Sequence, residues 1–258
     1  MKNKISLLVI SILFVLIATA QKQNNDWTRM NLKGKVKSIS ESSYSAIENS
    51  GEVQKQQGKR IDSLGHIFNN KGNETEQNLY NPAGSLKEKS TYKYDIKENK
   101  IEENLYNPDG SLKEKSTYRY DYDDKENKIR MKYYKQDGRL LIKINYEYDD
   151  KGNVIEQDII TYINSMSLNQ TITYKYDDKG NKIEQNNYDE YGKLQKKSTY
   201  KYDDKGNAIE NSLYNPDGSL RKKYTYEYKF DNNLNWIKRI VRENDVSTSI
   251  NERLIVYF

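Results

Sequence analysis

Residues 198–207 read Ser-Thr-Tyr-Lys-Tyr-Asp-Asp-Lys-Gly-Asn, and close variants of this stretch recur along the chain. The part before the aspartates returns as STYKYD at 90–95, STYRYD at 116–121, ITYKYD at 172–177 and YTYEYK at 224–229. The second tyrosine of each copy is Tyr94, Tyr120, Tyr148, Tyr176, Tyr202 or Tyr228, with spacings of 26, 28, 28, 26 and 26 residues. A steady period of this length indicates one supersecondary unit repeated along the chain.

Each repeat carries two turn signals. One is Asn-Pro-Asp-Gly, as at Asn107–Gly110, and the other is Asp-Asp-Lys-Gly-Asn, as at Asp203–Asn207. In both, the first side chain can cap the turn and the glycine can take a left-handed backbone conformation. Two such turns leave about nine residues per strand, so each repeat is predicted to be a strand pair in an antiparallel meander. The glycines expected as structural turn residues are Gly84, Gly110, Gly138, Gly152, Gly180, Gly192, Gly206 and Gly218.

Side-chain alternation predicts two different faces. Tyr200 and Tyr202 share one side of their strand, and Lys201 lies on the other. If Asp203 pairs with Asn207 across the turn, Tyr202 faces Ala208 and Lys201 faces Ile209. The two longer repeats exceed the others by an even number of residues, which preserves this alternation. We therefore predict an all-β fold of antiparallel β-hairpin repeats in one elongated, twisted or curled open sheet, with the tyrosines toward its concave side.

The two ends of the chain differ from the repeats. Lys2 and Lys4, the apolar run 5–17 and Ala18-Thr19-Ala20 have the features of a secretory signal with its cleavage site. We expect 1–20 to be a cleaved signal helix, 21–68 to be N-terminal cap strands, 69–228 the repeats and 229–258 C-terminal cap strands. The apolar run is shorter than the ~20 residues of a spanning helix. This predicts export to the periplasm, cell surface or exterior, with no membrane span after cleavage.

The motif Tyr-x-Tyr-Asp-x-x-Gly-Asn, repeated at hairpin spacing, resembles the YD repeats of Rhs-type bacterial proteins. The opening at 32–38, the pair Asn235-Trp236 and the tail 253–257 resemble small exported YD-repeat proteins that carry no toxin domain. Large proteins of this type wind their repeats into a hollow shell around a toxin. The few repeats here are expected to be too short to enclose anything, so the resemblance implies a repeat protein without that function. Glu98, Glu126 and Leu234 stand where the motif has glycine, and we expect those three turns to be distorted.

Composition argues against most chemistry. The 43 basic and 38 acidic residues are interspersed, which is typical of a solvated surface and not of a nucleic-acid or lipid patch. With zero cysteines and one histidine, nucleophilic cysteine chemistry is excluded, and most metal sites are too. His66 aligns with a repeat tyrosine, so we interpret it as a strand residue. We therefore expect no enzyme activity, no metal and no cofactor.

The tyrosines are the one candidate for ligand binding, because aromatic rows on a sheet can stack against sugars or peptides. The alternative is that they serve only as cross-strand pairs, each worth ~0.2–1 kcal/mol. The expected function is an exported, non-enzymatic scaffold or binding protein of the bacterial envelope or exterior, with a glycan or another envelope protein as partner. A carbohydrate-binding module and an envelope-polysaccharide hydrolase are the alternatives, and an immunity-like role stays open. The candidate ligand-facing tyrosines are Tyr92, Tyr94, Tyr118, Tyr120, Tyr174, Tyr176, Tyr200, Tyr202, Tyr226 and Tyr228.

Overall fold

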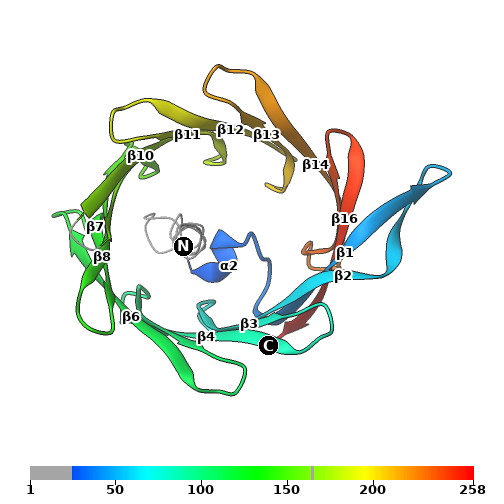
Figure 1. Ribbon diagram of the computed structural model, residues 1–258, viewed down its shortest axis with the longest axis horizontal. Helices are drawn as coiled ribbons and strands as arrows, with labels where there is room; N and C mark the ends of the chain where they lie inside the picture. Colours follow the sequence, from blue (N-terminus) through cyan, green and yellow to red (C-terminus); the bar gives the residue numbers. More distant parts are fainter. Residues whose placement is uncertain (1–24, 164–165) are drawn as a thin grey trace.

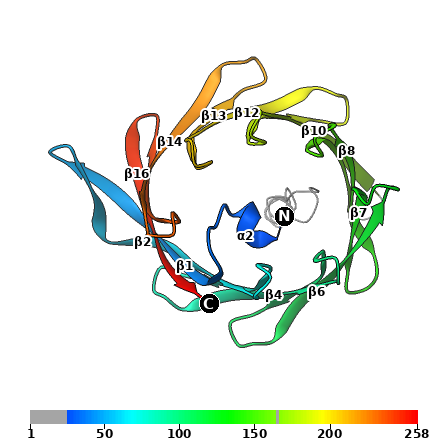
Figure 2. The same ribbon diagram turned by 180° about the vertical axis from the view of Figure 1, so that it is seen from behind.

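The computed structural model describes residues 25–163 and 166–258, and the strands in these ranges form one antiparallel sheet that closes into a barrel. Each strand pairs with the next along the chain, and the first pairs with the last (Figures 1 and 2). A short helix, α2 (Asp26–Arg29), lies inside the ring. The predicted signal helix at 1–20 lies outside the described residues. The all-β prediction is confirmed.

The described strands are sixteen in number and follow one another without interruption by any other element. Their bounds are β1 Val36–Asn49, β2 Glu52–Phe68, β3 Glu74–Tyr80, β4 Leu86–Tyr94, β5 Lys100–Tyr106, β6 Leu112–Tyr122, β7 Lys128–Lys135, β8 Leu140–Tyr148, β9 Val154–Ile163, β10 Met166–Tyr176, β11 Lys182–Tyr188, β12 Leu194–Tyr202, β13 Ala208–Tyr214, β14 Leu220–Phe230, β15 Trp236–Glu243 and β16 Val246–Tyr257.

The predicted open sheet is wrong. β1 and β16 pair in register from Ser38 opposite Val256 to Ser45 opposite Ser249, so the two ends of the sheet meet. An open sheet leaves two rows of unpaired backbone groups, and closure pairs them with each other. The curling expected for a wide twisted sheet therefore continues to full closure.

The resemblance to small exported YD-repeat proteins is corrected by the same finding. With that resemblance we expected open YD-like repeats too few to enclose a space, whereas the strands form a single closed barrel. The end segments at 36–68 and 236–257, interpreted as caps, supply four of the barrel's strands. They complete the ring because their backbone groups pair with each other across the seam between β1 and β16.

The tight turns keep one geometry throughout the barrel. In the turn between β12 and β13, the Asp203 amide donates to the Asn207 carbonyl at 2.9 Å and Gly206 has a φ of +80°. All eight predicted turn glycines have φ between +73° and +87°. The expected distortion at Glu98, Glu126 and Leu234 is absent, because these residues adopt φ of +63°, +63° and +65° and keep the same turn hydrogen bonds.

A β-bulge follows each tight turn and changes the predicted pairing. Tyr202 lies opposite Ala208, but Lys201 lies opposite Glu210 and not Ile209. The skipped residue is therefore the extra one of the bulge, and Ile209 and Glu210 share the side of Lys201. The equivalent shift occurs in β5, where Lys93 lies opposite Glu102 and Ile101 is skipped.

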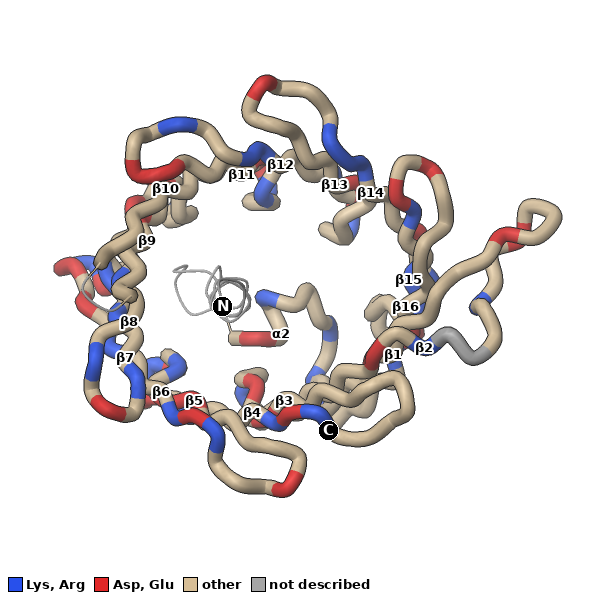
Figure 3. The backbone as a smooth tube through the Cα atoms, viewed as in Figure 1, with Lys and Arg blue, Asp and Glu red and all other residues tan. Residues whose placement is uncertain are grey.

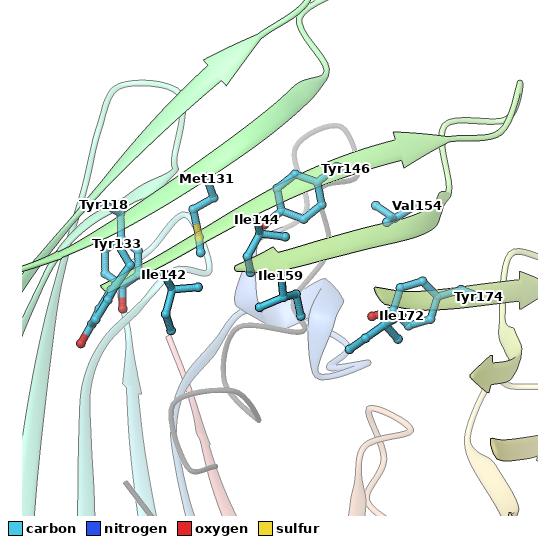
Figure 4. Close-up of a cluster of buried hydrophobic side chains, with 10 residues drawn as sticks. All are labelled: Tyr118, Met131, Tyr133, Ile142, Ile144, Tyr146, Val154, Ile159, Ile172 and Tyr174. Atoms are coloured by element: carbon cyan, nitrogen blue, oxygen red, sulfur yellow. The ribbon is translucent and has the colours of Figure 1, made fainter. Parts of the chain in front are cut away.

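The tyrosine face is the inner face of the barrel. The hydroxyl of Tyr94 donates to Asp26 of α2 at 3.0 Å, and α2 lies within the ring. Figure 4 shows ten buried side chains of β6 to β10 on the side of the strands where α2 lies. This cluster consists of Tyr118, Met131, Tyr133, Ile142, Ile144, Tyr146, Val154, Ile159, Ile172 and Tyr174. A second cluster joins the N-terminal segment to the wall through Leu32, Val36, Ile39 and Phe68.

The outer face carries ladders of opposite charges. Glu102 accepts from Lys93 and Lys115, each at 2.8 Å, and these lysines with Asn104 lower the pKa of Glu102 to about 2. Equivalent Lys–Glu–Lys trios centre on Glu184 and Glu210. Figure 3 shows basic and acidic positions interspersed around the ring.

Candidate binding site inside the barrel

The second tyrosine of each repeat holds neighbouring hairpins together. Its hydroxyl donates to a backbone carbonyl in the preceding hairpin, at 2.7 Å from Tyr120 to Lys100 and at 2.8 Å from Tyr202 to Lys182. Tyr94, Tyr176 and Tyr228 make the same contact at 2.6–2.7 Å. These bonds satisfy carbonyls at the β-bulges, where regular pairing is interrupted. The hydroxyls thus have a structural role, and the half-buried ring faces are the parts left for a ligand.

The first tyrosine of each repeat lies deeper in the wall. The hydroxyl of Tyr174 donates to Gln157 Oε1 at 2.8 Å, and the hydroxyl of Tyr118 donates to Glu103. Both rings are buried, with exposed fractions of 6%. The remaining first-position candidates, Tyr92, Tyr200 and Tyr226, lie on the same inner face.

Inward lysines accompany these rings. Lys182 Nζ lies 5.3 Å from the ring centre of Tyr174 and 5.1 Å from that of Tyr200, so it sits between two aromatic faces. Lys100 lies 3.6 Å from the Tyr92 ring and Lys128 lies 4.9 Å from the Tyr120 ring. Sequence reasoning placed the equivalent residue, Ala208, opposite Tyr202 but considered only the tyrosines as ligand-facing, so it missed these lysines. The sequence signal for the inward lysines is the tripeptide Asn-Lys-Ile at the end of the tight turn. This tripeptide occurs at 99–101, 127–129 and 181–183.

Burial lowers the pKa values of the three inward lysines. Loss of solvent around Lys182 lowers its pKa to about 8, and burial lowers the pKa of Lys100 and of Lys128 in the same direction. Within the described ranges, Lys182 has one hydrogen bond, to Gln185 Oε1 at 2.9 Å, and no carboxylate partner. The wall around β11 and β12 therefore combines aromatic faces with a cation that is not neutralised.

The segment Asn25–Lys33 crosses one end of the barrel. The Trp27 amide donates to the Gly72 carbonyl at 3.1 Å, in the turn between β2 and β3. Asn31 Nδ2 donates to Asn207 Oδ1 at 3.1 Å, and the Lys33 amide donates to Asn235 Oδ1 at 2.8 Å. These contacts tie the segment to turns on opposite parts of the ring, while the hairpins at the other end splay outward (Figure 2). Of the residues that the structure describes, none belongs to a helix with the length and hydrophobicity of a membrane-spanning segment.

His66 belongs to a buried polar contact beside α2. Its Nδ1 lies 2.5 Å from Glu74 Oε1, and Arg29 approaches the other oxygen of Glu74 at 3.8 Å. The imidazole also stacks on Phe68, with ring centres 6.3 Å apart. Among residues 25–163 and 166–258, no group of three histidine or acidic side chains is arranged to hold a metal ion.

The outer face has a shallow groove of about 370 Å³ over the seam of the barrel. It lies over β1, β2, β3 and β16, with Gly65, Tyr80, Leu254 and Val256 among its lining. None of the ten candidate tyrosines lines it. The groove and the tyrosine wall are thus separate features.

Comparison with known proteins gives few leads. No protein-family model matches the chain, and no curated protein matches it. Among solved structures, a porin-like protein from Bacteroides uniformis is 13% identical, with a TM-score of 0.36 over 92% of this chain and 100% of that one. A porin-like protein from Bacteroides vulgatus is 16% identical, with a TM-score of 0.28 over 84% and 97%. A DUF1329 family protein from Desulfovibrio piger is 9% identical, with a TM-score of 0.29 over 89% of each chain. Likenesses this distant carry no argument about function.

Proposed function

We propose that this chain is an exported, non-enzymatic binding protein of the bacterial envelope or exterior that holds a carbohydrate inside its barrel. The observation that carries the proposal is the position of Lys182 between the rings of Tyr174 and Tyr200 on the inner wall. Export rests on the sequence of residues 1–20, with its basic start, apolar run and Ala-x-Ala end.

The chemistry of this wall suits a sugar. The half-buried ring of Tyr200 can pack its face against the C–H face of a pyranose ring, while the buried Tyr174 supports Lys182 from the other side. A few fixed polar groups select hydroxyl positions. Gln185 and Asn187 place side-chain amides on the same inner face, joined by a 3.0 Å hydrogen bond, and Lys182 donates to Gln185. Closed antiparallel barrels commonly hold ligands in their interior. The outer face carries ion pairs and partly exposed isoleucines such as Ile183 and Ile209, whereas the inner wall brings aromatic faces and fixed polar groups together.

A glycan array followed by calorimetric titration tests the proposal. We expect the purified chain to bind at least one oligosaccharide class, and Lys182→Met to weaken that binding by tenfold or more. The matched control is Lys201→Met, because Lys201 faces outward and pairs with Glu210 at 3.0 Å. Absence of binding to every glycan, or equal affinity in Lys182→Met and the parent protein, would overturn the proposal.

A further inference from the structure

Two arginines and a tryptophan gather on the inner face near the seam of the barrel. Arg239 lies opposite Tyr228 in the β14–β15 pairing, and Arg253 lies opposite Glu41 in the β1–β16 pairing. Tyr228 belongs to the inner tyrosine row, since its hydroxyl bonds the Ala208 carbonyl. This cluster is on different strands from Lys182 and its two tyrosines.

The tryptophan orients both guanidinium groups. The guanidinium carbon of Arg253 lies 3.5 Å from the ring centre of Trp236, and that of Arg239 lies 4.7 Å from it. Stacking of this kind fixes the plane of a guanidinium and hence the direction of its N–H groups. Two planar donors are therefore held close to each other around one aromatic ring.

The cluster has more positive charge than it has acceptors. Glu41 is the carboxylate shared by both arginines, at 2.9 Å from Arg253 Nε and 3.7 Å from Arg239 Nη2. Only 9% of the Arg253 side chain is exposed. Arg253 Nη1 and Arg239 Nε are buried and have no hydrogen-bond partner among the described residues. A buried charged donor that lacks an acceptor is costly, so the geometry favours a second anionic group at this place.

We propose that Arg239, Arg253 and Trp236 form an oxyanion-binding site inside the barrel, which takes the carboxylate or phosphate group of a ligand. Guanidinium groups recognise such oxyanions through paired N–H donors with specific geometry. The site does not depend on the proposed carbohydrate, because none of its residues belongs to the wall around Lys182. A ligand that carries both a sugar and an acidic group could use both regions.

The test uses the whole purified chain at constant ionic strength, titrated calorimetrically with sodium phosphate and, separately, with sodium acetate. We expect saturable binding of at least one anion, and the tighter of the two identifies phosphate or carboxylate as the preferred group. Arg239→Met should weaken that binding by tenfold or more. Arg242→Met is the matched control, because Arg242 lies on the same strand and pairs with the exposed Glu227.

Two further variants keep the result interpretable. Arg253→Met leaves Glu41 without its closest partner and can disturb folding, so Arg253→Lys is used in its place, with circular dichroism as the check of the fold. The lysine retains the charge but lacks the planar fork, and we expect a tenfold loss of affinity. Lys182→Met should bind the anions as the parent does. The proposal fails if neither anion binds saturably or if Arg239→Met and Arg253→Lys retain full affinity.

Discussion

Leu234 shows how strongly the tight turn is imposed on single residues. It stands at the glycine position of the turn between β14 and β15, with a φ of +65° and 52% of its surface exposed. For a residue with a side chain, this left-handed conformation costs about 1–2 kcal/mol of stability. The hydrogen bonds of the turn are nevertheless present, from Asp231 N to Asn235 O at 2.9 Å. The rest of the barrel therefore holds the residue in a conformation that its own preference disfavours.

Leu234→Gly should raise the free energy of unfolding by about 1 kcal/mol, because it relieves this strain and removes an exposed side chain. Chemical denaturation of the variant and the parent measures the difference. Gly206→Leu, the reverse change in the equivalent turn at a φ of +80°, should lower stability by a similar amount. A destabilised Leu234→Gly would show that the leucine contributes packing that outweighs its strain.

Lys182 should make stability depend on pH in an identifiable range. Its pKa falls to about 8 in the folded protein, against 10.5 for an exposed lysine, so the unfolded chain binds more protons between these pH values. The contribution of this lysine to stability therefore rises as pH increases from 8 to 10.5, by roughly 3 kcal/mol at most. Lys182→Met should remove that rise.

Denaturation midpoints measured across this range, for Lys182→Met and for the exposed turn variant Lys179→Met, isolate the effect. Buried tyrosines with raised pKa values act in the opposite direction at higher pH, but they are common to both variants. Parallel pH profiles for the two variants would contradict the assignment of Lys182 as a buried, unneutralised lysine.

At the scale of elements, the tyrosine hydroxyls join successive hairpins across the bulges. Tyr202→Phe removes the 2.8 Å bond to the Lys182 carbonyl and should cost about 1 kcal/mol of stability. Tyr214→Phe is the control, because no hydrogen bond of its hydroxyl occurs in the described part of the chain. Amide exchange should increase mainly at β11 and β12. Equal effects of the two variants would mean that the ring contacts alone hold the hairpins together.

Substitution of Gly72 tests how tightly the segment Asn25–Lys33 packs across the end of the barrel. A Cβ there would lie 2.6 Å from the Trp27 ring, whereas at Gly152 it would meet nothing within 4 Å. Both glycines have positive φ, of +89° and +84°, so the backbone cost is shared. Gly72→Ala should therefore destabilise more than Gly152→Ala and shift tryptophan emission to the red. The same loss in both, without a spectral change, would argue that Trp27 does not pack tightly against this turn.

The sequence predicts the strands and turns well because their signals are local. Glycine in the tight turns and alternation around Tyr200 and Tyr202 are read within a few residues. The bulge is not predicted, since Lys-Ile-Glu alternates as well in a regular ladder as in a bulged one. Lys182 occupies the position of Ala208, which the predicted pairing already places opposite the second tyrosine, so its inward direction was available from the repeat. The lysine–tyrosine wall was missed because only the tyrosines were considered as ligand-facing. The cluster around Arg253 brings together strands far apart in the sequence and has no repeating signal.

At the scale of the whole molecule, closure is the property that defines the interior. It depends on the pairing of β1 with β16, which begins outside the repeats at both ends of the chain. An open sheet of sixteen strands would separate these edges by about 70 Å at the usual strand spacing. The barrel has an interior only if β1 and β16 are in direct contact, so every binding site proposed on the inner face depends on that contact.

Disulfide trapping across the seam tests closure most directly, because the chain has zero cysteines of its own. Ser40 and Leu254 lie opposite each other in the β1–β16 pairing, and Lys201 and Glu210 do so in the β12–β13 pairing. A disulfide needs Cα atoms within about 7 Å, so the double variant Ser40→Cys with Leu254→Cys should cross-link on mild oxidation as readily as Lys201→Cys with Glu210→Cys. Cross-linking of the second pair without the first would contradict the closed barrel.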